Sequence, residues 1–179
     1  MTLKFSKGLI RLATRNDAAL LASWWADGEI MAHAGFPHGI KTDINLLKEK
    51  LAKPNKKNLI FILETLKHTP IGEMSYHVNG RVATIGIKIC DFKYQEKGYG
   101  TGALKRLITH LFDDLEVEKI VLDTMIENTR AQHVYKRLGF KKVKINEAVW
   151  TDQLGQKRTS VDFELDKDDY TINKLFYLS

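Results

Sequence analysis

The sequence predicts an α/β fold of the α+β type, in which helices flank both faces of one mixed, mostly antiparallel sheet. The chain has 179 residues, enough for one domain with a substantial core. Before residue 54 the apolar residues recur at the spacing of a helix, and after it they alternate with polar ones as in a strand. Strand and helix patterns then alternate around a glycine-bearing loop. We therefore expect a single domain over residues 1–179, with its core at about 9–165 and a short helical tail over 166–179.

The composition is that of a soluble globular protein, with 44% hydrophobic and 28% charged residues. The single cysteine, Cys90, excludes a disulfide framework and a cysteine-rich metal site, and it suits a reducing compartment. The sequence has neither the apolar core of a signal peptide nor a run of about 18 apolar residues. We expect a cytoplasmic protein without a membrane partner.

The net charge is +6, from 28 Lys and Arg against 22 Asp and Glu. A basic balance suits nucleic acid, but it suits a highly anionic small ligand equally well. The lysines are scattered along the chain rather than gathered in a block, so nucleic acid is the less favoured partner.

Two helices are expected in the first third of the chain. Thr14 to Asp17 has the pattern of a capping box, and the helix behind it ends near Asp27-Gly28. Residues 29–40 contain glycine and proline and predict a loop or a broken helix. A second helix is expected from Thr42-Asp43 to the residue before Pro54. The expected apolar stripes of the two helices are Leu20, Leu21, Trp24 and Trp25, and then Ile44, Leu47 and Leu51.

Strands follow over residues 59–64, 71–78 and 81–89, and Asn79-Gly80 predicts a two-residue hairpin turn between the last two. After the glycine loop, the sequence predicts a helix to about Phe112 and a strand over 118–124. A helix capped by Asn128 and ended by Gly139 comes next. Strands over 140–150 and 158–165 are joined by a turn at 152–155, and residues 168–176 form a short helix.

The stretch from Gln95 to Thr101 joins an apolar strand to a helix that carries Leu104, Leu107 and Ile108 on one face. Glycines let a ligand approach the main chain closely. The first amides of a helix lack intrahelical acceptors, and the helix dipole adds positive charge there. This order of elements predicts a phosphate-binding loop.

The loop also allows three other interpretations. Gly98, Gly100 and Ala103 fit a dinucleotide fingerprint, but the polar residues 93–97 separate them from the strand, and the loop lies in the middle of the chain. A Walker loop would require Gly-Lys-Ser/Thr, which is absent. A structural turn without a ligand is the third reading.

Two motifs together resemble the GCN5-related N-acetyltransferases. Gln95-x-x-Gly98-x-Gly100 is similar to the family's Q/R-x-x-G-x-G/A loop, and residues 128–140 are similar to its N-x-x-A-x-x-x-Y-x-x-x-G-F segment. The resemblance covers residues 9–165. The stretches 11–17 and 24–27 are similar to the branch that acetylates the N-termini of ribosomal proteins and related amines.

The resemblance implies a sheet splayed around acetyl-CoA, which serves as co-substrate. It places the pyrophosphate on the amides of Lys97, Gly98, Gly100 and Thr101. Gln95 would shape the loop entrance. Main-chain groups of Ile87 and Ile89, together with Asn128, would hold the pantetheine arm. Asn128 can also be a plain helix cap.

The resemblance also implies that Tyr135 protonates the departing thiolate as a general acid, although an aromatic residue at this spacing is equally an ordinary core residue. The acceptor amine must lose a proton, and a carboxylate is the usual base. We select Glu73, with His77 and Asp91 as alternatives. Each of the three can instead be simply exposed or structural.

On the acceptor side, the resemblance places Trp24, Trp25, Met31 and Phe36, with the acids Asp27 and Glu29. Core packing and helix capping are the competing readings of these residues. His33 and His38 lack a third clustered ligand, so no metal site is expected. A buried thiol is expected for Cys90.

The predicted activity is transfer of an acetyl group from acetyl-CoA to a primary amine by direct attack. The acceptor stays open between a peptide N-terminus and a small amine such as a polyamine or an aminoglycoside. The alternative is a non-catalytic acyl-CoA-binding sensor on the same fold. The resemblance also allows a homodimer, without indicating its surface.

Overall fold

The computed structural model describes residues 1–178. The chain divides into two compact units. The first unit contains Met1–Ala13, Pro54–Val121 and the chain from Glu164, and the second contains Thr14–Lys53 and Leu122–Phe163. No helix among residues 1–178 is long and apolar enough to cross a membrane.

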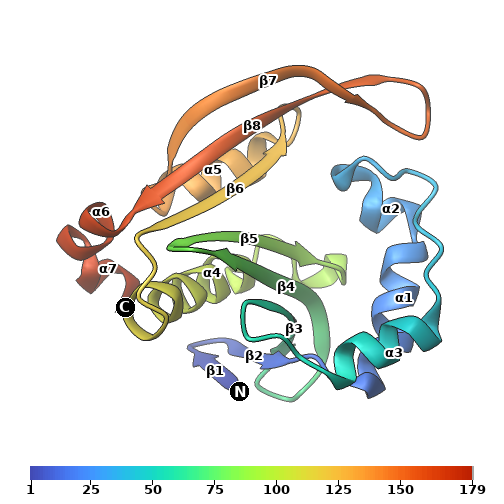
Figure 1. Cartoon of the computed structure of the whole chain (residues 1–179), viewed down its shortest axis with the longest axis horizontal. Helices are drawn as coiled ribbons and strands as arrows, with labels where there is room; N and C mark the ends of the chain where they lie inside the picture. The colour runs from blue at the N-terminus through green and yellow to red at the C-terminus, as the bar shows by residue number, and fades with distance from the viewer. Residues whose placement is uncertain (179) are drawn as a thin grey trace. The chain divides into compact units, whose positions relative to one another are not determined.

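The first unit is built on a sheet whose first five strands are antiparallel neighbours in chain order (Figure 1). They are β1 (Thr2–Phe5), β2 (Gly8–Leu12), β3 (Asn58–Thr65), β4 (Pro70–Asn79) and β5 (Val82–Ile89). β6 (Lys119–Met125) then pairs in parallel with β5 over Val82–Thr84. The parallel pair requires a crossover, and a helix provides it.

That crossover helix is α4 (Tyr99–Thr109), which follows the short η3 (Phe92–Tyr94) and continues into a π-helical turn, η4 (His110–Asp114). Its predicted apolar stripe is buried, as Leu104, Leu107 and Ile108 are at most 1% exposed. The predicted tail helix consists of two helices, α6 (Lys167–Ile172) and α7 (Lys174–Leu178). Lys105 fixes α7 to α4, because its Nζ donates to the Phe176 carbonyl at 2.6 Å.

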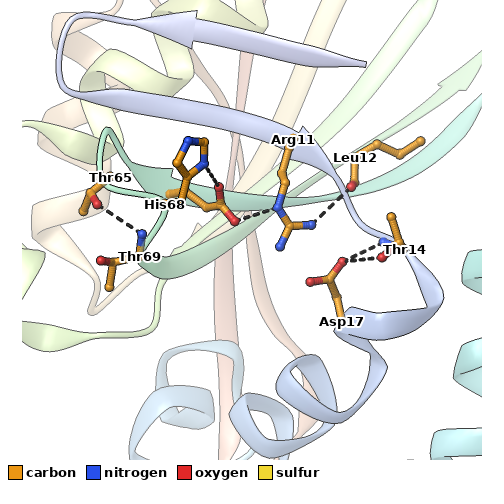
Figure 2. Close-up of polar contacts among 8 residues, drawn as sticks. Arg11, Leu12, Thr14, Asp17, Thr65, His68 and Thr69 are labelled. Atoms are coloured by element: carbon orange, nitrogen blue, oxygen red, sulfur yellow. Dashed lines mark hydrogen bonds and ion pairs between the residues drawn. The ribbon is translucent and has the colours of Figure 1, made fainter.

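An ion pair connects β2 with β3 (Figure 2). Arg11 Nε donates to Glu64 Oε1 at 2.6 Å, and His68 Nδ1 lies 3.2 Å from Glu64 Oε2. The Glu64 side chain is only 4% exposed. A buried carboxylate is costly unless its oxygens are satisfied, so these two contacts explain how Glu64 is tolerated there.

The second unit begins with η1 (Arg15–Asp17), α1 (Ala18–Ala26), α2 (Gly28–Met31), η2 (Ala32–Ala34) and α3 (Ile44–Ala52). The predicted capping box is present, since Thr14 N donates to Asp17 Oδ2 at 2.8 Å (Figure 2). The expected burial of Ile44 is wrong, because this first residue of α3 is 40% exposed, whereas Leu47 and Leu51 are buried. Trp24 and Trp25 are half-buried rather than core residues.

The rest of the second unit contains α5 (Thr129–Arg137), β7 (Lys141–Thr151) and most of β8 (Lys157–Asp166), which enters the first unit at Glu164. The strand order is β6-β8-β7. α5 ends as predicted. Gly139 has a left-handed φ of 86°, and Phe140 N donates to the Tyr135 carbonyl at 3.0 Å, which is a Schellman ending.

One predicted turn is displaced by a residue. Asn79 is not in the turn but pairs with Val82, so the two-residue loop is Gly80-Arg81. Gly80 has φ 59° at the first central position, where a type II′ turn requires a positive value. The strand order β1-β2-β3-β4-β5-β6-β8-β7 confirms the predicted mixed, mostly antiparallel sheet.

Candidate functional site

The glycine loop connects β5 to α4, as the sequence predicts. α4 begins at Tyr99, and its N-cap is Gly98, whose φ of 83° lies in the left-handed region that favours glycine. The first helical hydrogen bond runs from Gly102 N to Gly98 O at 3.0 Å. The amides of Tyr99, Gly100 and Thr101 therefore precede the helical ladder and have no acceptor within it.

This helix end is suited to an anion. Gly98 has no side chain to cap it, and the first turn, Tyr99–Gly102, carries no acidic residue. The exposed amides and the helix dipole together favour a negatively charged group at this position.

Gly100 faces the end of β5. A Cβ added there would lie 3.8 Å from Ile87 Cδ1 and 3.9 Å from Ile89 Cγ1. These are ordinary van der Waals distances, so packing against the protein does not require glycine at this position. A ligand lying against the Gly100 amide would require it.

The main chain of Ile87 and Ile89 points away from β4. Cys90 N donates to the Ile71 carbonyl at 2.9 Å, and the register pairs Ile89 with Gly72 and Ile87 with Met74. Bonded and non-bonded pairs alternate in an antiparallel ladder, so Ile87 and Ile89 form the non-bonded pairs with β4. Within the first unit, β5 pairs with β6 only over Val82–Thr84. Beyond Thr84, the edge of β5 that faces away from β4 therefore has no strand partner among the described residues of that unit.

Gln95 and Lys97 have different surroundings. Gln95 Nε2 donates to the Ile89 carbonyl at 3.1 Å, which fastens the loop to the end of β5. The Lys97 side chain is exposed, and the Lys97 carbonyl accepts a hydrogen bond from Lys7 Nζ at 2.6 Å. Gln95 thus shapes the loop, and Lys97 presents its charge to solvent.

The proposed base Glu73 lies on β4, opposite Lys88 of β5. Its Oε1 is 3.0 Å from Lys88 Nζ, and the Glu73 side chain is 13% exposed. Of the two alternatives, Asp91 accepts a hydrogen bond from Lys93 N at 3.0 Å as the cap of η3, and His77 is exposed. Cys90 is buried, with 5% exposure.

In the second unit, α5 carries Asn128 and Tyr135. Asn128 Oδ1 caps the helix by accepting from Ala131 N at 3.2 Å. Tyr135 is 8% exposed and packs edge-on against Phe163, with ring centroids 5.7 Å apart. Burial, reinforced by the negative charge of Asp123, raises the pKa of Tyr135 to about 12. Its hydroxyl is therefore protonated at neutral pH.

Asp123 of β6 is an acidic residue with a perturbed pKa that neither sequence motif includes. It lies on the exposed side of β6, yet desolvation of its carboxyl and repulsion from Asp162 raise its pKa above the usual range. Asn146 Nδ2 donates to Asp162 Oδ1 at 2.8 Å. The available signal was an acid directly after the apolar run Ile120-Val121-Leu122 and shortly before Asn128.

A clamp fastens residues 35–39 to the turn between β7 and β8 within the second unit. Gln153 Oε1 accepts from His38 N, and Gln153 Nε2 donates to the Gly39 carbonyl, both at 2.8 Å. Phe36 stacks on Trp150 with ring centroids 6.3 Å apart. A Cβ on Gly35 would lie 1.6 Å from Trp150 Cη2, so only glycine fits there.

Of the two predicted acceptor-side acids, Asp27 has a structural contact. Asp27 Oδ1 caps α2 by accepting from Glu29 N at 2.8 Å, which agrees with the capping reading for Asp27. Glu29 is exposed. Among residues 1–178 no group of three or more His, Cys, Asp or Glu side chains is arranged to hold a metal ion.

Comparison with known proteins identifies the fold and the family. Residues 8–141 match the acetyltransferase (GNAT) domain family. A spermidine N-acetyltransferase from Vibrio cholerae, solved in complex with CoA and spermine, superposes with a TM-score of 0.82 at 21% identity, covering 92% of this chain and 98% of that one. A comparison with curated protein sequences gave no significant match.

Two further solved structures have the same fold. The ribosomal-protein-S5-alanine acetyltransferase from Vibrio fischeri gives a TM-score of 0.77 at 19% identity, covering 95% and 98% of the two chains. A GNAT-family acetyltransferase from Bacillus anthracis gives 0.78 at 19% identity, covering 94% and 99%. These likenesses show the fold, and the domain match covers most of the chain. The chain therefore belongs to the GNAT family and is an N-acetyltransferase.

Proposed function

We propose that the enzyme transfers an acetyl group from acetyl-CoA to a primary amine by direct attack, without a covalent acetyl-enzyme. The observation that carries this proposal is the start of α4, where Gly98 turns the chain and Gly100 leaves its amide open beside Ile87 and Ile89. Cys90, the only thiol, is buried at the end of β5, which argues against a thioester intermediate on the protein.

The donor-binding residues are those that the family resemblance implies, and the loop geometry at the start of α4 supports them. Acetyl-CoA supplies an acyl group activated as a thioester. The loop residues hold its pyrophosphate through main-chain amides, and the open edge of β5 at Ile87 and Ile89 holds the pantetheine arm. Asn128 uses Oδ1 for its helix cap, so the Nδ2–H donor of its side-chain amide is the group assigned to the arm. The pyrophosphate contacts belong to Lys97, Gly98, Gly100 and Thr101.

Tyr135 is assigned as the general acid, because its pKa of about 12 keeps the proton available for the leaving sulfur. Glu73 is assigned as the general base that accepts the proton of the amine. Asp123 is the second candidate for the base, because its raised pKa brings its proton affinity closer to neutral pH. Two substitutions, Glu73→Gln and Asp123→Asn, distinguish the candidates. Only the substitution that removes the general base should lower turnover by about a hundredfold or more.

The acceptor is assigned as a primary amine, the group acetylated by the spermidine and ribosomal-protein enzymes that share this fold. An experiment must decide whether this amine belongs to a peptide N-terminus, a polyamine or an aminoglycoside. The cytoplasmic location expected from the sequence is kept in this proposal, because the buried Cys90 suits a reducing compartment.

The test is calorimetric titration with acetyl-CoA, followed by free-thiol release with spermidine, an alanine-initiated peptide and an aminoglycoside. Tyr135→Phe should lower turnover by about a hundredfold or more, the usual contribution of a positioned acid, while acetyl-CoA affinity stays the same. Binding without thiol release from any amine would favour the non-catalytic sensor. No binding by the wild-type enzyme would overturn the loop assignment.

A further inference from the structure

The turn between β1 and β2 packs against the start of α4. Lys7 Nζ donates to the Lys97 carbonyl at 2.6 Å, although 90 positions separate the two residues. From the same hairpin, the Phe5 ring lies 2.7 Å from the position of a Cβ added to Gly102. The hairpin therefore packs beside the glycine loop, and its residues belong to neither sequence motif.

The Lys7 ammonium lies beside the residue that turns the loop. It is 3.3 Å from the position that a Cβ on Gly98 would occupy. Glycine at position 98 therefore also leaves room for this side chain. Lys7 is exposed, so the position of its ammonium follows from this contact and not from burial.

The charge of Lys7 adds to a loop that already favours anions. An ammonium has three N–H donors, and the structure gives one of them a neutral carbonyl as acceptor. An ammonium also attracts an acceptor of opposite charge by Coulombic force, a gain that a neutral carbonyl does not offer. A phosphate at the α4 amides would offer Lys7 such a partner, whereas the loop's own acid, Glu96, already has interactions.

We propose that Lys7 is a phosphate-binding residue of the donor site and holds a phosphoryl group of acetyl-CoA. This rests on the proposed function, since acetyl-CoA brings the phosphates. Two phosphate positions share this chemistry, the pyrophosphate and the 3′-phosphate, and ligands that lack one or both separate them.

The experiment measures dissociation constants of acetyl-CoA, acetyl-3′-dephospho-CoA and acetyl-pantetheine for the wild type and for Lys7→Gln, Lys7→Arg and Lys4→Gln. Lys4→Gln is the matched control, because Lys4 is an exposed lysine on the same hairpin. We expect Lys7→Gln to weaken acetyl-CoA about tenfold, Lys7→Arg to retain most of the affinity and Lys4→Gln to change it less than about twofold. Affinity for acetyl-pantetheine should be the same in all four proteins.

The loss of affinity that Lys7→Gln causes for acetyl-3′-dephospho-CoA identifies the phosphate that Lys7 binds. A tenfold loss that persists with this ligand assigns Lys7 to the pyrophosphate, and one that disappears assigns it to the 3′-phosphate. An equal loss for acetyl-pantetheine, or unchanged acetyl-CoA affinity in Lys7→Gln, would overturn the proposal and leave Lys7 as a tether of the hairpin. Failure of the wild type to bind acetyl-CoA is a different result, which contradicts the proposed function itself.

Discussion

Gly98 and Gly100 are two positions apart, and glycine serves a different purpose at each. The backbone of Gly98 has φ 83°, which a residue with a Cβ adopts only at a cost of about 1–2 kcal/mol. Gly100 is helical and has ordinary space around it. The sequence motif shows that both are glycine, but only the structure shows that the backbone conformation requires glycine at position 98 and not at position 100.

Gly100→Ala should separate folding from donor binding. Alanine favours a helix over glycine by about 1 kcal/mol, so the variant should be as stable as the wild type or more so. The added methyl group should nevertheless weaken acetyl-CoA binding by about tenfold or more, because it stands where the ligand approaches the amide. Thermal unfolding and calorimetry measure the two effects. A variant that is stable and binds acetyl-CoA normally would contradict the assignment of this amide.

Asp123 gives a prediction for pH dependence. Its pKa is raised in the folded protein, so its contribution to stability is fully present below its usual pKa and is lost as the pH rises through the raised value. Asp123→Asn removes the charge and should be more stable than the wild type at neutral pH, with the difference shrinking on acidification. Solvent screening at this exposed site keeps the difference small.

Thermal melts between about pH 4 and pH 7 follow this difference, since an unperturbed aspartate titrates near pH 4. The same substitution should lower the pKa of Tyr135 below its value of about 12, because it removes the negative charge of Asp123. A spectrophotometric tyrosine titration reads this second effect. A stability difference that stays constant with pH is the contradicting result.

Among the elements, α4 connects the core to the glycine loop. Its apolar stripe packs into the first unit, and the amides of its first turn have no acceptor within the helix. Burial of the stripe fixes the helix, and the helix fixes the direction of those amides. A well-packed core thus supports a site built mostly from main-chain atoms.

Leu107→Ala should destabilise the protein by about 2–5 kcal/mol, because Leu107 is fully buried and the substitution leaves a cavity. Leu46→Ala on α3 is the matched control, since Leu46 is 66% exposed, and it should change stability by less than about 0.5 kcal/mol. Chemical denaturation measures both. Similar losses for the two variants would show that α4 is not packed as described.

Most of the elements were predictable because their signals are local. Each signal lies within a few neighbouring residues, as for the apolar stripe of α4, the capping box at Thr14 and the Schellman ending at Gly139. The errors were also local. Ile44 fits the apolar spacing of α3, yet it is the first helical residue and is 40% exposed. Asn79-Gly80 identified a turn, but strand pairing moved its centre by one residue.

At the scale of the whole molecule, the contacts between residues far apart in the sequence were not predictable. Lys7 meets Lys97 across 90 positions, and Gln153 meets Gly39 across 114. Periodicity indicates which face of an element is buried but carries no information about its distant partner. Glu73 shows the same limit, since its place beside Lys88 depends on strand register.

The net charge of +6 is also a property of the whole molecule that bears on ligand binding. Scattered lysines give the protein a positive field that attracts anionic ligands such as acetyl-CoA. In the proposed function, the uncharged main-chain N–H donors at the start of α4 would then provide the specific contacts.

The Gln153 clamp has a consequence for how this enzyme can change over generations. Gln153 grips residues 38 and 39 only through main-chain atoms, so the side chain at position 38 can be exchanged without loosening the clamp. The glycine at position 35 must stay, because Trp150 fills its space. A segment that the family resemblance assigns to the acceptor side is thus fastened independently of its own chemistry. Substitution at position 38 can therefore change the chemistry of this segment while its backbone stays in place.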